Sequence, residues 1–90
     1  MKRAAGRAWL NPLGDVDTGW VGWNIKVGSY TSNKNHLEGE IIVHDCSRAV
    51  NLSLWCDNKG DVKKRIKKVD SFIKELEKCK AALEEIGEEL

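Results

Sequence analysis

The stretch LEGEIIVHDCSRAVNLSLWC, residues 37–56, contains two alternating runs separated by a short polar turn. In both runs apolar residues recur at every second position, which is the period of a half-buried β-strand. If Asp45 faces Arg48 across the turn, the apolar faces of the two runs match, with the pairs Val43–Val50, Ile41–Leu52 and Gly39–Leu54. A slip of one residue would mix the faces. The stretch therefore predicts an antiparallel hairpin with strands at about 37–45 and 49–56.

The turn between these runs holds five chemically different side chains in HDCSR, residues 44–48. One interpretation is a reactive Cys46 beside His44 and Asp45. Successive strand residues point to opposite faces, however, and Cys46 has no helix N-terminus that would favour its thiolate. We favour a turn in which Asp45 accepts backbone hydrogen bonds near Ser47 and pairs with Arg48. Asp45, Ser47 and Arg48 remain the first candidate binding residues.

A metal site is not expected from the histidines and cysteines of this region. Within the predicted hairpin, Cys56 lies opposite Leu37 and about 30 Å from Cys46, whereas zinc requires ligands within ~2.3 Å. We interpret Cys56 and Cys79 as small core residues. We expect no cofactor.

Upstream of the hairpin, GWVGWNIKVG at residues 19–28 alternates in the same way and predicts a third strand. The polar segment SYTSNKN that follows is typical of a loop. Residues 1–18 show no clear period and are broken by Pro12 and Gly14, so we expect an arm, with Trp9 placed against the body of the domain. Residues 19–90 then form a single domain.

Downstream, after DNKG at residues 57–60, the apolar period changes to that of a helix over about 61–88, with Asp61 as its cap. Such a helix is roughly 40 Å long, whereas the strands reach about 26–33 Å, so its second half would extend beyond the sheet. The predicted fold is α+β, with a three-stranded antiparallel sheet packed on its apolar face by one long C-terminal helix. The helix carries an apolar stripe of Val62, Ile66, Val69, Ile73, Leu76 and Leu83, widened by Phe72, Cys79 and Ile86.

The charges of this helix oppose its own dipole, because it begins with KKRIKK and ends with four glutamates. Antiparallel pairing of two copies would place each basic start near an acidic end and cover the extending stripe. We therefore expect a homodimer through Leu76, Leu83 and Ile86, although Lys80 and Gly87 argue against a long regular coiled coil. The basic run is also a candidate phosphate site, which includes Lys63, Lys64, Arg65, Lys67 and Lys68.

Trp20 and Trp55 fall on the second face of the predicted sheet, together with Ile42. Two aromatic residues on one exposed face indicate an interface. The polar residues between them make this face suitable for a protein partner, a second copy or a stacked base. The alternative is that the N-terminal arm folds over the face, with Trp9 filling the gap.

The composition of the 90-residue chain excludes several classes of protein. Fifteen basic residues against fourteen acidic ones give a net charge of +1, and no apolar run reaches the ~18 residues of a membrane span. The odd number of cysteines, three, is unusual for a small secreted domain and favours a cytoplasmic location. The chain contains no G-x-S-x-G, P-loop, HExxH or dinucleotide motif, so an enzyme is the least supported class.

The order of short strands, a DCSR turn, a strand ending in an aromatic residue and KKVDSFIKELEKCKAAL resembles small α+β proteins of bacteriophages and mobile elements, over roughly residues 37–83. The resemblance implies a non-enzymatic protein that inhibits or sequesters a host factor, such as an anti-defence inhibitor in the host cytoplasm. The factor would be a protein or a small signalling ligand. The alternative is a nucleic-acid-binding protein that uses the basic helix start and the arm with Lys2, Arg3 and Arg7.

Overall fold

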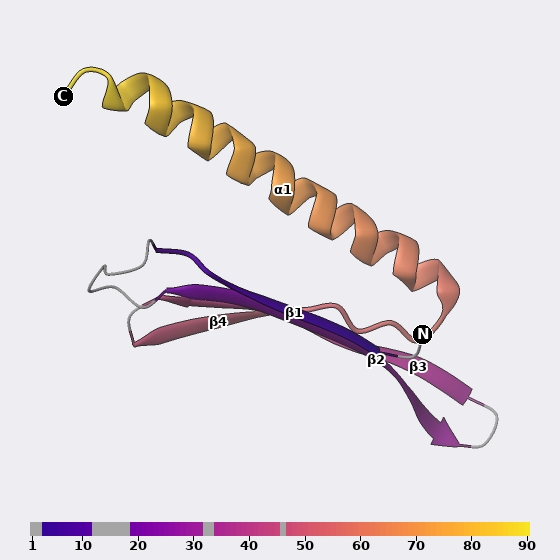
Figure 1. Cartoon of the computed structure of the whole chain (residues 1–90). Helices are drawn as coiled ribbons and strands as arrows, with labels where there is room; N and C mark the ends of the chain where they lie inside the picture. Colours follow the sequence, from indigo (N-terminus) through magenta and orange to yellow (C-terminus); the bar gives the residue numbers. More distant parts are fainter. Residues whose placement is uncertain (1–2, 12–18, 32–33, 46) are drawn as a thin grey trace. The chain divides into compact units, whose positions relative to one another are not determined.

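The computed structural model describes residues 3–11, 19–31, 34–45 and 47–90, with the backbone alone at 29–31 and 34. It is α+β, with one antiparallel sheet and one C-terminal helix, as predicted. Lys2, residues 12–18 and Cys46 lie outside the described residues. The elements are β1 (Arg3–Trp9), β2 (Trp20–Thr31), β3 (Lys34–Asp45), β4 (Arg48–Ser53) and α1 (Lys59–Gly87), shown in Figure 1.

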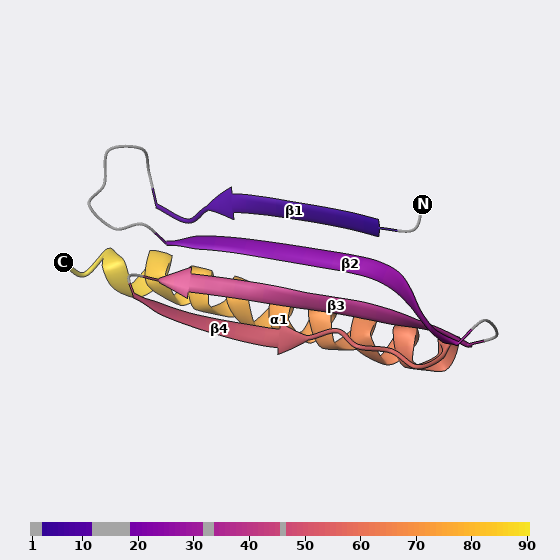
Figure 2. The same cartoon turned by 90° about the horizontal axis from the view of Figure 1, so that it is seen from below.

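The sheet has four strands in the order β1-β2-β3-β4, so neighbours in the chain are neighbours in the sheet (Figure 2). All three pairings are antiparallel. The prediction of three strands is therefore wrong, because the residues assigned to an arm include β1. This strand pairs with β2 from Arg3 opposite Lys26 to Trp9 opposite Trp20.

Strand β1 was missed because its sequence, RAAGRAW, is made largely of alanine and glycine, which are depleted in strands. The structure shows why small residues suit this position. Gly6 lies opposite Trp23, and a Cβ atom on Gly6 would stand 2.5 Å from Nε1 of that indole. The glycine therefore makes room for a tryptophan ring of the neighbouring strand.

The register of β3 and β4 confirms the pairing predicted from alternation. Asp45 is opposite Arg48, Val43 is opposite Val50, and Ile41 is opposite Leu52. Beyond β4 the same register continues through a bridge between Leu37 and Cys56. Since Asp45 and Arg48 are register partners, two residues separate the strands, as the predicted register requires.

Strands β2 and β3 are longer than predicted, because most of the segment interpreted as a loop at 29–35 belongs to their hairpin. The ladder continues through Ser29 opposite Asn35 to Thr31 opposite Lys34, with an irregularity between Ser29 and Thr31. Serine, threonine and tyrosine are compatible with strand backbone, and once two strands are in register their ladder can extend through polar residues.

The registers divide the sheet into two faces. The apolar face carries Val21, Trp23, Ile25, Val43 and Leu52 with their register partners, including Ala4, Gly6 and Ala8 of β1. Within the described residues, the buried apolar side chains are Leu54 and Cys56, 5% and 2% exposed. The other apolar side chains of this face are partly exposed to solvent, and Val50 is 60% exposed.

Helix α1 begins at Lys59, before the predicted cap, so Asp61 lies in its first turn. There its carboxylate interacts favourably with the positive end of the helix dipole and lies 3.9 Å from the ammonium group of Lys64. No residue of the helix is buried. Cys79 is exposed, so its interpretation as a core residue is wrong, whereas Cys56 is buried as expected.

The chain divides into two compact units, Met1–Lys59 with the sheet and Gly60–Leu90 with nearly all of α1. The expectation that the helix covers the apolar face of the sheet stays a prediction. Within the described part of the chain, no helix is both long and apolar enough to cross a bilayer.

Candidate binding surface

The second face of the sheet, called the mixed face below, combines aromatic, charged and amide side chains. It consists of the strand residues that alternate with those of the apolar face. Its described members from the four strands include Arg3, Arg7, Trp9, Trp20, Asn24, Lys26, His36, Glu38, Glu40, His44 and Asn51. The face therefore presents both signs of charge and several planar rings.

One end of the mixed face is a cluster of stacked groups, which we call the Trp20 cluster and which consists of Arg7, Trp9, Trp20 and His44. The Arg7 guanidinium carbon lies 4.3 Å from the centre of the Trp20 ring and 5.2 Å from that of Trp9. Both distances fall within the range of cation–π attraction. On β3, the His44 ring stacks on Trp20, with 5.6 Å between centroids and 10° between planes.

The Trp20 cluster depends on three strands at once. Arg7 and Trp9 come from β1, Trp20 from β2 and His44 from β3. Trp9 is 66% exposed, so a flat aromatic surface remains open beside a fixed positive charge. Such a surface suits another planar ring, an aliphatic side chain or a group that accepts hydrogen bonds from guanidinium.

The middle of the mixed face is a polar band centred on Glu40. Its two carboxylate oxygens accept hydrogen bonds from Asn24 on β2, at 3.3 Å, and from Asn51 on β4, at 3.1 Å. Each amide thus holds one oxygen, and the carboxylate is fixed across three strands. The band separates the two aromatic ends of the face.

The far end, called the Trp55 cluster, consists of Lys26, His36, Glu38, Trp55 and Asp57. The His36 ring stacks on Trp55 at 4.6 Å, and the Trp55 indole donates a hydrogen bond to Asp57 at 3.0 Å. Glu38 Oε1 lies 2.9 Å from His36 Nε2, and Glu38 Oε2 lies 3.2 Å from Lys26 Nζ. The hydrogen bonds from His36 and then Lys26 hold the pKa of Glu38 below its usual value.

The structure does not bring the two predicted tryptophans together. Trp20 is opposite His44, whereas the register of β3 and β4 places Trp55 beside Glu38. Six residues of strand separate these positions, or about 20 Å. Trp20 and Trp55 therefore belong to two separate clusters on one face.

The turn residues proposed as a site lie at the end of the sheet that holds the Trp20 cluster. Asp45 and Arg48 form the last register pair of β3 and β4, next to the pair of His44 and Ala49. Asp45, Ser47 and Arg48 are all exposed. Their ion pair and turn hydrogen bonds stay predictions, and Cys46 between them is outside the described residues.

The predicted basic residues lie on α1, in the unit separate from the sheet. Lys63, Lys64, Lys67 and Lys68 are exposed, and Arg65 is half-buried. In the described part of the chain, no group of three or more histidine, cysteine or acidic side chains is arranged to hold a metal ion.

Sequence reasoning missed the strand that holds Arg7 and Trp9, since both were assigned to an arm. The alternative that placed Trp9 over the face of Trp20 agrees with the pairing of Trp9 and Trp20, but nothing placed Arg7 there. One signal was present: Arg3, Arg7 and Trp9 alternate with Ala4, Gly6 and Ala8. Alternation of large polar residues with small ones is weaker than alternation with valine or isoleucine, because small side chains bury little apolar area. The pattern indicates a strand only when a bulky residue of a neighbouring strand, such as Trp23, is known to pack over the small side chains.

Comparisons with known protein families, with curated proteins and with solved structures find no match to this chain.

Proposed function

We propose that this chain is a small binding protein without catalytic activity, of the kind that bacteriophages use to inhibit or sequester a factor of the host cell. The observation that carries the proposal is the Trp20 cluster, in which Arg7 lies over two indole rings and Trp9 is 66% exposed. Exposed tryptophan and arginine are the residues most enriched at the energetic centres of interfaces. The factor is a host protein or a small signalling ligand.

The mixed face favours binding over chemistry for a physical reason. Its carboxylates are engaged, Glu40 by two amides and Glu38 by His36 and Lys26. Side chains that are already fixed by neighbours provide a rigid surface, which reduces the entropy lost when a ligand binds. Rigid aromatic groups beside satisfied polar groups are what a recognition surface requires.

The test compares the chain with Trp9→Ala and with the control Val50→Ala, which removes an exposed apolar side chain from the opposite face of the same sheet. Each immobilised protein is exposed to the protein fraction and to the small-molecule filtrate of a bacterial lysate. We expect a retained factor whose binding falls at least tenfold with Trp9→Ala and is unchanged with Val50→Ala. A factor retained equally by all three proteins, or one converted to a product, would contradict the proposal.

Nucleic acid is the second candidate, and one observation favours it. Arg3, Arg7 and Lys26 lie on the same face as Trp9 and Trp20. Arg7 is beside the two indole rings, whereas Arg3 and Lys26 are at the other end of the β1–β2 ladder. Arg3 and Lys26 are directly opposite each other and line a depression between β1 and β2. Stacked bases and phosphate contacts need this combination of rings and cations.

Fluorescence anisotropy with labelled DNA and RNA oligonucleotides separates the two candidates. Binding through phosphates should weaken steeply with salt, since it releases counterions. Substituting Arg3 and Arg7 by alanine tests the mixed face, and substituting Lys67 and Lys68 tests the helix. If no oligonucleotide binds at low salt, nucleic acid is excluded and the first proposal stands alone.

A further inference from the structure

Seven apolar residues of α1 are placed symmetrically about one of their number, Leu76. Counting outward from Leu76, apolar residues occur at distances of three, seven and ten in both directions. Toward the start these are Ile73, Val69 and Ile66, and toward the end they are Cys79, Leu83 and Ile86. All seven residues lie within α1.

Four lysines and four glutamates of the helix region have the same centre. Lys68, Lys67, Lys64 and Lys63 precede Leu76 by eight, nine, twelve and thirteen residues. Glu84, Glu85, Glu88 and Glu89 follow it by the same four distances. Two independent patterns, one apolar and one of opposite charges, are therefore related by the same reflection.

We propose that two copies of this chain pair through α1, antiparallel, with the two-fold axis at Leu76. A two-fold axis requires that if residue i lies level with residue j of the second copy, then j lies level with i. In this register Leu76 meets its own copy, Ile73 is level with Cys79, Val69 with Leu83, and Ile66 with Ile86. The proposal names a centre and a register, and it does not depend on what the mixed face binds. Because it uses Ile66, Val69 and Ile73, it is an alternative to the expectation that the first half of α1 packs on the sheet.

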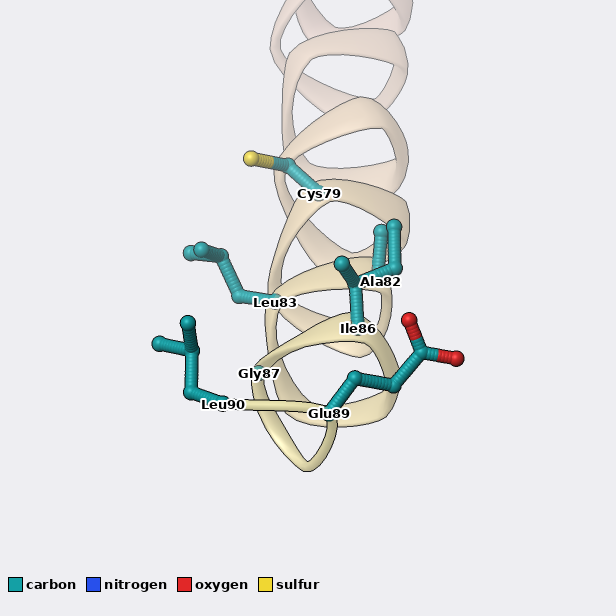
Figure 3. Close-up of a pocket in the computed structure, with 7 residues that line it drawn as sticks. All are labelled: Cys79, Ala82, Leu83, Ile86, Gly87, Glu89 and Leu90. Atoms are coloured by element: carbon teal, nitrogen blue, oxygen red, sulfur yellow. The ribbon is translucent and has the colours of Figure 1, made fainter.

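The side chains that this register would cover are exposed in the single chain. Leu76 is 53% exposed, Leu83 71% and Ile86 65%. At the end of the helix, Cys79, Leu83 and Leu90 lie on one side and, with Ile86 and Ala82, line an open apolar depression (Figure 3). A second helix placed antiparallel would bring Val69 and Ile66 to the level of this depression.

Charge selects the antiparallel orientation. In a parallel pair, the basic start of one helix would lie beside the basic start of the other, and like charges would repel. In the proposed register, Lys67 and Lys68 lie level with the second copy's Glu85 and Glu84. The central charges are like, with Lys74 level with Lys78 and Glu75 level with Glu77. Lys78 and Glu75 form an ion pair at 3.1 Å within one helix, which offsets part of this repulsion.

A neighbouring register also pairs apolar residues with one another, but it fits the charges less well. Moving the centre by half a heptad, so that Val69 is level with Leu76, shifts every pair by seven residues. Ile86 is then level with Lys59, and Lys67 is level with Lys78. The register centred on Leu76 keeps all seven apolar residues within the pair and matches every lysine of the basic block with a glutamate.

Disulfide trapping tests the register directly, in a background with Cys46→Ser. Adding Ile73→Cys places a thiol level with Cys79 of the second copy, and Leu76→Cys with Cys79→Ser places two thiols at the axis. The two native Cys79 residues are six residues apart along the pair, or about 9 Å, beyond the ~4.4–6.8 Å that Cα atoms of a disulfide span. In a parallel pair, Cys79 would instead lie level with itself.

We expect mild oxidation to give covalent dimer with Ile73→Cys and with Leu76→Cys, at least tenfold faster than with Cys79 alone. The background with Cys79→Ser controls for the buried Cys56. Rapid cross-linking through Cys79 alone, or failure of both added cysteines to cross-link, would overturn the register. Sedimentation of the unmodified chain as a monomer at tens of micromolar would overturn the pair itself.

Exchange of the charges tests the orientation without removing apolar contacts. Lys67→Glu with Lys68→Glu should raise the dimer dissociation constant about tenfold at low salt, because glutamates then lie level with glutamates. Adding Glu84→Lys and Glu85→Lys should restore the value to within about threefold. If the four substitutions together weaken the dimer as much as the first two, the antiparallel pairing of these blocks is wrong.

Discussion

The sheet and the helix of this chain are held in different ways. In the sheet, side chains far apart in sequence meet, as Arg7 does with Trp20 and Glu40 with Asn51. The ion pairs of the helix that the structure describes join residues three or four apart, such as Lys80 and Glu84. The sheet also buries Leu54 and Cys56, whereas α1 buries nothing. Long-range contacts therefore specify the sheet, whereas the ion pairs described within the helix are local.

The same truncation in the two regions gives the largest expected contrast. Leu54 is 5% exposed and Leu83 is 71% exposed. Leu54→Ala should lower the free energy of unfolding by about 2–4 kcal/mol, because it removes a buried side chain and leaves a cavity. Leu83→Ala should affect unfolding of the dilute chain by less than about 1 kcal/mol, since its side chain is mostly in water already. Urea titration followed by circular dichroism measures both, and equal losses would remove the contrast.

Enlarging Gly6 should detach one strand of the sheet. Gly6→Val introduces side-chain atoms where the Trp23 ring lies, and overpacking of this kind costs about 1–3 kcal/mol. We expect hydrogen exchange to lose protection in β1 while β3 and β4 keep theirs. Ala5→Val is the control, because Ala5 is on the same strand but is exposed on the opposite face. Equal loss of protection in both variants would show that the Trp23 contact is not what matters.

A glycine in the helix should act locally. Ala81 is exposed and lies away from the apolar stripe, so Ala81→Gly changes helix propensity alone, at about 0.5–1 kcal/mol. The expected result is weaker protection of amides in the last turns of α1, with unchanged protection in β2 and β3. Loss of protection in the sheet would show that the two regions unfold together.

The smallest expected effect is a pH dependence that belongs to the sheet. The pKa of Glu38 is lowered by the hydrogen bond from His36 and by Lys26, from an ordinary value of about 4.5. The resulting stabilisation is complete above the unfolded pKa and is lost as the pH falls through the lower folded pKa. Between pH 6 and pH 3, the urea midpoint of Glu38→Gln should fall less than that of the unmodified chain. The midpoint of Lys26→Ala should fall by an intermediate amount, because the contact with His36 remains. An unchanged slope in Glu38→Gln would contradict this assignment.

How far the sequence predicts this molecule differs between its parts. The β3–β4 register followed from alternation, because large β-branched residues leave one pairing that keeps the faces apart. Strand β1 did not, since alanine and glycine carry almost no periodic signal and the space they leave is filled by a residue elsewhere in the chain. The Trp20 cluster could be predicted only in part for the same reason. One alternative placed Trp9 over this face, but Arg7 joins the cluster only when β1 is placed beside β2.

The pairing of Gly6 with Trp23 has a counterpart at the other end of β2, where Gly28 lies opposite His36 and a Cβ on Gly28 would stand 2.6 Å from the imidazole. Alternation distinguishes only odd from even slips, because a strand displaced by two residues keeps every side chain on its proper face. A displacement of two in either direction would move each ring from a glycine to a residue that carries a Cβ atom. The two glycines therefore favour the observed register over slips of two residues, which hydrophobic patterning alone leaves equivalent.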